Sequence, residues 1–158
     1  MNIEELLTRE SIRQTITRYT MAGDRLRVQE FLEVFTADAI LESEEVGASD
    51  TFLYQGKKEI GAWLQRWRDL ATEPSALATQ ATFVRHHIST SDIVIVDADS
   101  AKARTYWTAY TDIGPDHCGY YVDSFQKVKD QWLIQHRKVR LDWRSPNSLF
   151  TMAINNTR

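Results

Sequence analysis

Apolar residues in the first part of the chain recur every three or four positions, which is the spacing of one face of an α-helix. Residues 2–22 follow this pattern, with acidic residues near the front, and predict one helix or two short ones. Gly23 interrupts the pattern, and a second helix is expected to follow Asp24, with Val28, Phe31, Leu32 and Phe35 on its buried side. The clearest stripe lies in residues 57–71 and predicts a third helix with Ile60, Trp63, Leu64, Trp67 and Ala71 in the core.

Short extended segments separate the second and third predicted helices. Residues 36–41 are typical of a turn that enters a strand, and we expect residues 42–50 to form an irregular acidic loop. Residues 52–55 predict a short strand that ends at Gly56. The small residues at 74–79 predict the connection from the third helix to the second half of the chain.

The second half is rich in strand patterns. Strands are expected at 81–90, 91–96, 101–112, 119–128 and 131–143, with turns at 97–100, 113–116 and 129–130, and the first two can form one long bent strand. Short turns favour antiparallel neighbours, and strands of this length usually curl. The pattern therefore predicts an α+β fold, in which a strongly twisted sheet wraps against three helices and encloses a small-molecule pocket.

Composition narrows the class of protein. With 158 residues, 42% hydrophobic and 26% charged, we expect a single domain over 1–158. The net charge of −3 and the absence of a basic cluster argue against a nucleic acid or an anionic membrane as partner. Cys118 is the only cysteine, so an intrachain disulfide is excluded. Because there is also no apolar leader segment, we expect a cytoplasmic location.

Two adjacent histidines lie in the strand predicted at residues 83–89. Because successive side chains of a strand point to opposite faces, His86 shares a face with Val84 and Ile88, whereas Arg85 and His87 lie on the other. An imidazole among apolar neighbours can act as a base, but it can equally be a core histidine with a satisfied hydrogen bond. Arg85 and His87 are assigned to the outside, at a subunit contact or paired with an acid such as Asp123.

A metal site is not expected. Adjacent strand histidines diverge, and His86, His87 and His117 show no spacing typical of metal ligands.

The order of several short motifs resembles that of the SnoaL-like branch of the nuclear transport factor two-like superfamily. The motifs are ITRY at 16–19 with GD at 23–24, VFTADA at 34–39, RHHIS at 85–89, GYYVDSF at 119–125, and WLI at 132–134 with Arg137 and DW at 142–143. The resemblance spans nearly the whole chain. It implies a cone-shaped α+β barrel of a curved, mostly antiparallel sheet, closed by about three N-terminal helices, around a deep apolar pocket.

The resemblance also implies roles for particular residues. Lyases of the family have a His and an Asp in the pocket, at positions that correspond to His86 and Asp24, so that His86 would abstract a proton while Asp24 orients its ring. Tyr19 would donate to a developing oxyanion, and Tyr54, Trp107 and Tyr121 would contact the substrate. Neither a cofactor nor a metal is implied.

Each assignment has a structural alternative. Asp24 can be only the N-cap of the second helix, and Tyr19 only a core residue. Where scytalone dehydratase has a second histidine and a tyrosine, this sequence has Trp107 and Gly23, which argues against scytalone as the substrate.

Two hypotheses of different class follow. The chain is a cofactor-free lyase or isomerase that acts on a small hydrophobic, cyclic substrate by dehydration, elimination or proton transfer. Alternatively, it is a non-catalytic domain that binds a small ligand or supports an oligomer, similar to the small subunit of ring-hydroxylating dioxygenases. In either case we expect a homo-oligomer, a dimer or trimer, formed through a sheet face that carries Arg85, His87 and Tyr110.

Overall fold

The computed structural model describes residues 2–45, 51–72 and 81–150. The elements are α1 (Ile3–Gly23), α2 (Val28–Leu32), β1 (Phe35–Glu45), β2 (Leu53–Gln55), α3 (Gly56–Thr72), β3 (Arg85–Ile95), β4 (Ser100–Thr111), β5 (Gly114–Val128) and β6 (Gln131–Arg144). The region predicted at 2–22 is therefore a single helix, α1, with Asn2 as its N-cap. No helix in these ranges is long and apolar enough to cross a membrane.

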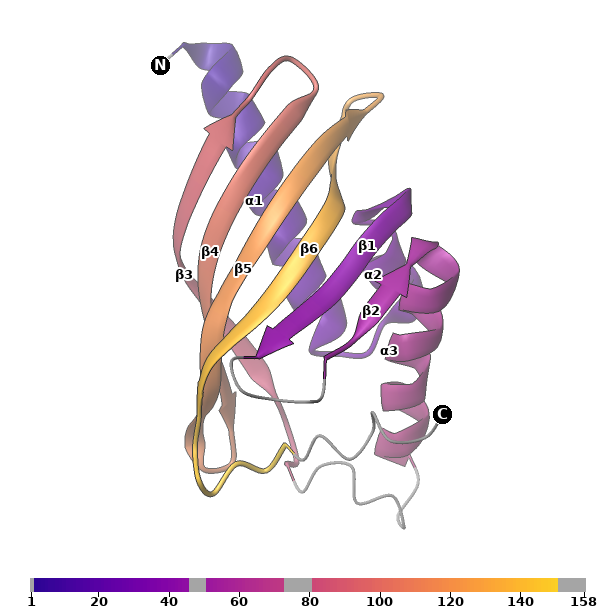
Figure 1. Ribbon diagram of the computed structural model, residues 1–158, viewed down its shortest axis with the longest axis vertical. Helices are drawn as coiled ribbons and strands as arrows, with labels where there is room; N and C mark the ends of the chain where they lie inside the picture. Colours follow the sequence, from indigo (N-terminus) through magenta and orange to yellow (C-terminus); the bar gives the residue numbers. More distant parts are fainter. Residues whose placement is uncertain (1, 46–50, 73–80, 151–158) are drawn as a thin grey trace.

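The strands form one six-stranded sheet in the order β2-β1-β6-β5-β4-β3 (Figure 1). β3 to β6 are a consecutive antiparallel meander, β1 pairs with β2 antiparallel, and only β1 against β6 is parallel. The sheet is curled but its edges do not meet, so the predicted α+β fold and mostly antiparallel sheet are confirmed, with an open sheet instead of a closed barrel.

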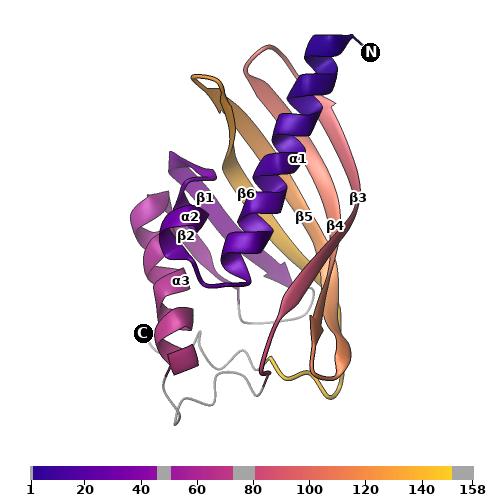
Figure 2. The ribbon, with the colours of Figure 1, turned by 180° about the vertical axis from the view of Figure 1, so that it is seen from behind.

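The helices cover one face of this sheet. α1 runs diagonally along it, and α2 and α3 lie beside its lower half (Figure 2). The core between the layers contains Ile12 and Ile16 from α1, Phe31 from α2 and Ile60 from α3, all at most 2% exposed. Thr15 fastens α1 to the sheet, because its hydroxyl donates to the carbonyl of Trp132 at 2.6 Å. The inner face of the sheet is therefore where helix and strand side chains meet.

β3 is one continuous strand that joins the two predicted segments, but it begins at Arg85 and not at residue 81. Its pairing with β4 shifts register between Ile88 and Ser91, which is the bend expected there. The start of β5 was placed too late at 119, because the strand begins at Gly114. The hairpin turns tightly around Gly114, whose φ of +89° suits glycine, so Pro115, His117 and Cys118 already pair with β4. Asp116 lies at a register shift between them.

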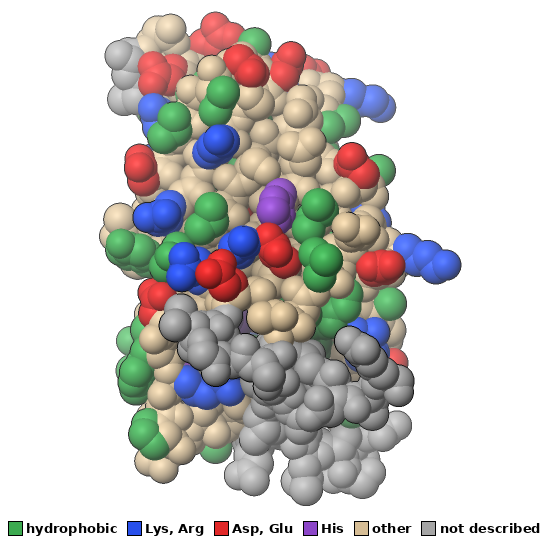
Figure 3. Space-filling model, viewed as in Figure 1, with side chains coloured by type: hydrophobic (Ala, Val, Ile, Leu, Met, Phe, Trp, Pro, Cys, Tyr) green, Lys and Arg blue, Asp and Glu red, His purple; other side chains and the backbone are tan. Residues whose placement is uncertain are grey.

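The acidic loop expected at 42–50 was wrong in its first part. Residues 42–45 belong to β1, next to β6. Lys138 lies 3.4 Å from Glu42 and 3.5 Å from Glu44, and Arg140 lies 3.5 Å from Glu44. The acidic residues of β1 therefore pair with basic residues of the neighbouring strand β6. Charges of both signs lie side by side on this outer face (Figure 3). Residues 46–50, and the connection predicted at 74–79, lie outside the described residues.

Candidate active site

One row of side chains crosses the inner face of the sheet. His86 of β3 pairs with Ala109 of β4, and Ala109 pairs with His117 of β5. Alternation along β4 buries Ala109, so the row faces the helices. The two imidazole rings on either side of Ala109 approach to 6.1 Å between centroids.

His86 is held by Asp24 from the end of α1. Asp24 closes that helix through its backbone N–H, which donates to the carbonyl of Thr20. Its carboxylate accepts two hydrogen bonds from His86, one from ring Nδ1 at 2.5 Å and one from the backbone N–H at 2.8 Å. Because a carboxylate only accepts, Nδ1 carries a proton, and in the neutral ring Nε2 then carries the lone pair.

Exposure of the pair differs between its two members. The Asp24 side chain is 7% exposed and that of His86 is 26% exposed, so the imidazole is the accessible one. Chemically, such a pair can act as a base with an orienting acid.

The alternative role of Asp24 as an N-cap was wrong. α2 begins after Arg27, which provides no side-chain cap, and Leu26 at φ 54° turns the chain between the helices. This turn leaves the Asp24 side chain facing β3.

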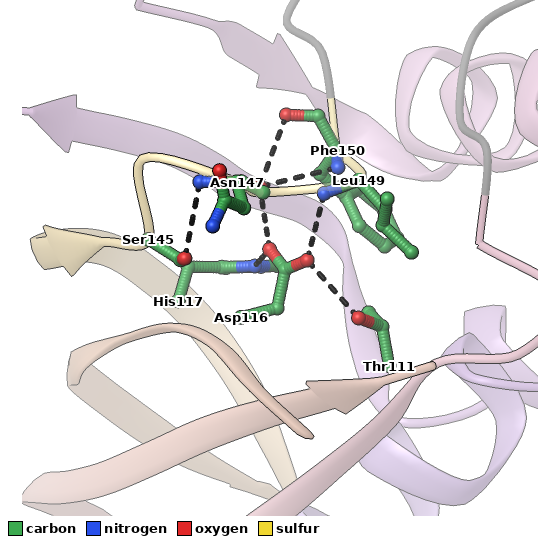
Figure 4. Close-up of polar contacts among 8 residues, drawn as sticks. Thr111, Asp116, His117, Ser145, Asn147, Leu149 and Phe150 are labelled. Carbon is green, nitrogen blue, oxygen red and sulfur yellow. Dashed lines mark hydrogen bonds and ion pairs between the residues drawn. The ribbon is translucent and has the colours of Figure 1, made fainter. Parts of the chain in front are cut away.

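A second pair, His117 and Asp116, lies next to the first, with the His117 ring 6.1 Å from that of His86. Figure 4 shows the surroundings of this second pair. Nδ1 of His117 lies 2.7 Å from Oδ1 of Asp116, and the His117 side chain is 12% exposed. Asp116 is buried and also accepts from the Thr111 hydroxyl, the Ser148 hydroxyl and the Leu149 backbone N–H. Asp116 therefore fixes the His117 ring and the segment after β6 at once.

The charge states of this second pair follow from its surroundings. Burial alone would raise the pKa of Asp116, but the hydrogen bonds from Ser148, Leu149, His117 and Thr111 outweigh it and lower this pKa. Burial lowers the pKa of His117, although Asp116 opposes this, and a charge on His86 lowers it further. Near neutral pH the pair is a neutral imidazole that donates from Nδ1 to a carboxylate.

Trp107 lies against both histidines. Its ring centroid is 5.5 Å from that of His86 and 5.6 Å from that of His117, and it stacks on Tyr121 at 5.8 Å. The indole Nε1 is buried and has no hydrogen-bond partner among the described residues. Trp107 and Tyr121, two of the three predicted substrate contacts, are thus brought together with His86.

Tyr19 lies behind this cluster. Its ring contacts Tyr121 at 5.7 Å, and the Arg137 guanidinium lies 4.0 Å from the ring centroids of both tyrosines. Burial raises the pKa of Tyr19, so the phenol stays protonated at neutral pH and remains a donor.

Arg137 is fully buried and forms a two-pronged pair with Asp123, Nε to Oδ1 at 2.8 Å and Nη2 to Oδ2 at 2.6 Å. The proposed pairing of Arg85 or His87 with Asp123 was therefore wrong. Asp123 points to the inner face at the register position of Arg137, whereas His87 lies on Tyr110, with centroids 4.5 Å apart. Burial alone would lower the pKa of Arg137, but the Asp123 carboxylate outweighs it and raises this pKa, so the guanidinium stays charged.

Tyr54, the third predicted substrate contact, lies on β2, away from the histidine row. Its ring packs on Phe52 at 5.3 Å and Trp63 at 5.9 Å, and Trp63 in turn contacts Phe31. Phe31 contacts Tyr19, so Tyr54 joins the site only through a series of aromatic rings.

No group of three or more potential ligands that could hold a metal occurs among the residues that the structure describes. In both His–Asp pairs one ring nitrogen is already bonded to a carboxylate.

Residues 4–138 match the family model of the SnoaL-like domain. The chain belongs to the SnoaL-like family. The match covers α1 through most of β6 and includes Asp24, His86, Asp116 and His117. No curated protein matches the sequence.

Solved structures show where this SnoaL-like fold recurs. A candidate scytalone dehydratase from Novosphingobium aromaticivorans is 21% identical, with a TM-score of 0.70 over 92% of this chain and 91% of its own. The β subunit of a candidate aromatic-ring-hydroxylating dioxygenase from the same organism is 17% identical, with a TM-score of 0.71 over 92% and 95%. Hexachlorocyclohexane dehydrochlorinase LinA-type3 from Novosphingobium barchaimii is 12% identical, with a TM-score of 0.70 over 96% and 99%. At these identities the likeness establishes the fold alone.

Proposed function

We propose that this SnoaL-like protein is a cofactor-free lyase or isomerase that uses His86 as a general base on a small, hydrophobic, cyclic substrate. The observation that carries the proposal is the double hydrogen bond between Asp24 and His86, which fixes the ring and leaves Nε2 as the ring nitrogen that can take a proton. Fold relatives named as a dehydratase and a dehydrochlorinase support the reaction class.

The proposed first step is removal of a proton from carbon. The C–H bond breaks, its proton binds Nε2 of His86, and its electron pair moves toward a neighbouring carbonyl or expels a leaving group. Asp24 stabilises the imidazolium that forms. In elimination of water, the same imidazolium returns the proton to the departing hydroxide, so the site ends as it began.

Neighbouring rings supply the remaining roles in the proposal. Trp107 and Tyr121 contact the substrate ring, and Tyr19, which burial keeps protonated, donates toward the developing negative charge. In the proposal, Tyr54 is linked to the substrate only indirectly, because it lies at the far end of the series of aromatic rings and contacts Trp63.

The test is a turnover screen with a matched pair of variants. Cyclic β-hydroxy ketones, halogenated rings and unsaturated ring ketones are incubated in D₂O, and NMR follows both product and deuterium incorporation next to the carbonyl. We expect His86→Ala to lose about 10²–10⁴-fold in rate with its circular dichroism unchanged. His87→Ala changes the adjacent, exposed imidazole on the opposite face and should retain activity. Equal activity of a folded His86→Ala variant contradicts the proposal.

A second candidate function is a non-catalytic, ligand-binding or oligomer-supporting domain. The outer sheet face favours it, because Val94, Tyr106 and Val122 are 37–53% exposed there. Arg85, His87 and Tyr110 lie on the same outer side, where we propose a contact in a homodimer or homotrimer. Sedimentation analysis of wild type and Tyr106→Glu tests this contact, and an unchanged monomeric mass in both contradicts it.

A further inference from the structure

The helix that carries Asp24 is also fastened to β3 near its other end. β3 is the last strand of the sheet, so one edge of its backbone has no strand neighbour in the described part of the chain. At this edge, near the start of β3, the Asp24 carboxylate accepts from the His86 backbone N–H at 2.8 Å. Toward the end of β3, Nη1 of Arg9 donates to the Ile93 carbonyl. α1 thus lies antiparallel to β3, with its first turns beside the end of the strand (Figure 2).

The two contacts are spaced alike on the helix and on the strand. Arg9 and Asp24 are 15 residues apart, which is about 22 Å at the rise of an α-helix. His86 and Ile93 are seven residues apart, which is about 23 Å along an extended strand. The axial position of α1 that brings Asp24 to His86 is therefore the one that brings Arg9 to Ile93.

Glu5 holds the Arg9 side chain in place for this contact. Its Oε1 accepts from Nη2 of Arg9 at 2.9 Å and from Nε at 3.4 Å, while Nη1 is bonded to the Ile93 carbonyl. A guanidinium presents several donors in one plane, which is what simultaneous bonds to two partners require. The guanidinium thus connects the start of α1 to the end of β3.

α1 can act as a lever because a third contact lies between the other two. The Thr15 hydroxyl donates to the Trp132 carbonyl at 2.6 Å and fixes the middle of the helix to β6. Arg9 lies six residues before this pivot and Asp24 nine residues after it, which is about 9 Å and about 14 Å along the helix. If the helix turns as a rigid body, a displacement of about 1 Å at Arg9 becomes about 1.5 Å at Asp24. A shift of this size breaks the hydrogen bonds from His86.

We propose that Arg9 is a positioning residue, which acts through α1 to hold the Asp24 carboxylate against His86. Loss of its bond to Ile93 lets the helix turn about Thr15 and draws Asp24 away from the imidazole. A misplacement of about 1 Å in a catalytic group can cost about 100-fold in rate. The inference rests on the proposed function only in taking His86 and Asp24 as the working pair.

The alternative is that Arg9 only stabilises the fold, by covering a backbone carbonyl at the free edge of β3. Two control variants separate the roles. Arg13→Met removes an exposed arginine that pairs with Glu10 on the same helix. Ile60→Val removes one buried methyl group from α3 and lowers stability without altering a polar side chain.

The experiment follows hydrogen exchange of the His86 backbone N–H by NMR, relative to the amides that β3 shares with β4. In wild type the bond to Asp24 protects this N–H. We expect Arg9→Met, which keeps an unbranched apolar side chain, to speed the relative exchange about tenfold or more. Arg9→Lys should restore part of the protection, because an ammonium can still donate to the Ile93 carbonyl. Both control variants should leave the ratio unchanged.

The ¹⁵N shifts of the His86 ring give a second readout. As Asp24 draws away, neutral His86 should lose its preference for the Nδ1–H tautomer in Arg9→Met but keep it in both controls. An unchanged exchange ratio and tautomer in a folded Arg9→Met variant would overturn the inference. Equal acceleration in Ile60→Val, with both variants matched in stability, would overturn it too, because the effect would then be a general loss of stability.

The outcome is separable from that of the proposed function, since neither readout needs a substrate. If turnover survives His86→Ala while Arg9→Met still loosens the contact of Asp24, only the catalytic proposal fails. If turnover depends on His86 but its N–H stays protected in Arg9→Met, only the positioning role fails.

Discussion

The imidazole rings of His86 and His117 lie 6.1 Å apart at an interplanar angle of 83°, and each donates from Nδ1 to its own aspartate. Only Ala109 separates them in the sheet row. A positive charge on one imidazole ring disfavours a positive charge on the other. Protonating both rings to imidazolium at the same time is therefore unfavourable. A neutral His117 is thus compatible with the imidazolium that the proposed reaction would form at His86.

Stability should depend on pH through His117. Burial lowers its pKa from 6.5 in the folded state, so below about pH 6.5 the unfolded chain binds more protons than the folded chain, and stability falls as the pH falls. We expect His117→Phe to show a shallower loss of unfolding free energy between about pH 7 and pH 5. Urea denaturation at several pH values measures this, and His87→Ala is the exposed control. A slope as steep in His117→Phe as in wild type would refute this origin.

Removing one member of the buried ion pair between Asp123 and Arg137 should lower the free energy of unfolding far more than replacing both. Asp123→Ala leaves the Arg137 guanidinium buried and unpaired, at an expected cost of roughly 3–5 kcal/mol. The double variant Asp123→Leu with Arg137→Met removes both charges and should lose much less. Denaturant midpoints give the comparison, and a loss under about 1 kcal/mol for Asp123→Ala would contradict the account.

Gly119 should tolerate no side chain. A Cβ there would lie 1.9 Å from the backbone carbonyl oxygen of Arg140 on the next strand, which cannot move without breaking the β5–β6 pairing. We expect Gly119→Ala to cost about 1–3 kcal/mol or more.

Gly114 is the matched control, because a Cβ there meets nothing within 4 Å and carries only the strain of its positive φ. Thermal melts of both variants make the comparison. A Gly119→Ala variant that is more stable than Gly114→Ala would show that the close approach does not limit the sheet.

The local sequence pattern predicted the face of the sheet on which His86 lies, because the alternation of side chains along a strand depends only on neighbouring residues. Val84, His86 and Ile88 share the inner side, as expected, and the bend in β3 was also foreseen. The family resemblance supplied Asp24, which the sequence alone cannot bring to β3 from a distance of 62 residues.

The second pair was missed for a physical reason. Asp116 was assigned to a turn because Gly-Pro next to Asp is typical of turns, and His117 was considered only as a metal ligand. The tight turn at Gly114 places both residues within β5, where only the pairing with β4 shows that His117 faces His86. Likewise, the partner of Asp123 depends on the β5–β6 register, which no local rule provides.

The central claim, that Asp24 holds His86 as a base with a free Nε2, is tested most directly by ¹⁵N NMR of the histidine rings. The account predicts that neutral His86 is the Nδ1–H tautomer in wild type and that this preference weakens in Asp24→Asn, whose side-chain amide can also donate. His87, on the opposite face, provides the reference in the same spectrum. An Nε2–H tautomer for His86 in the wild-type protein would contradict the account, because the nitrogen proposed as the base would then carry a proton and could not abstract one.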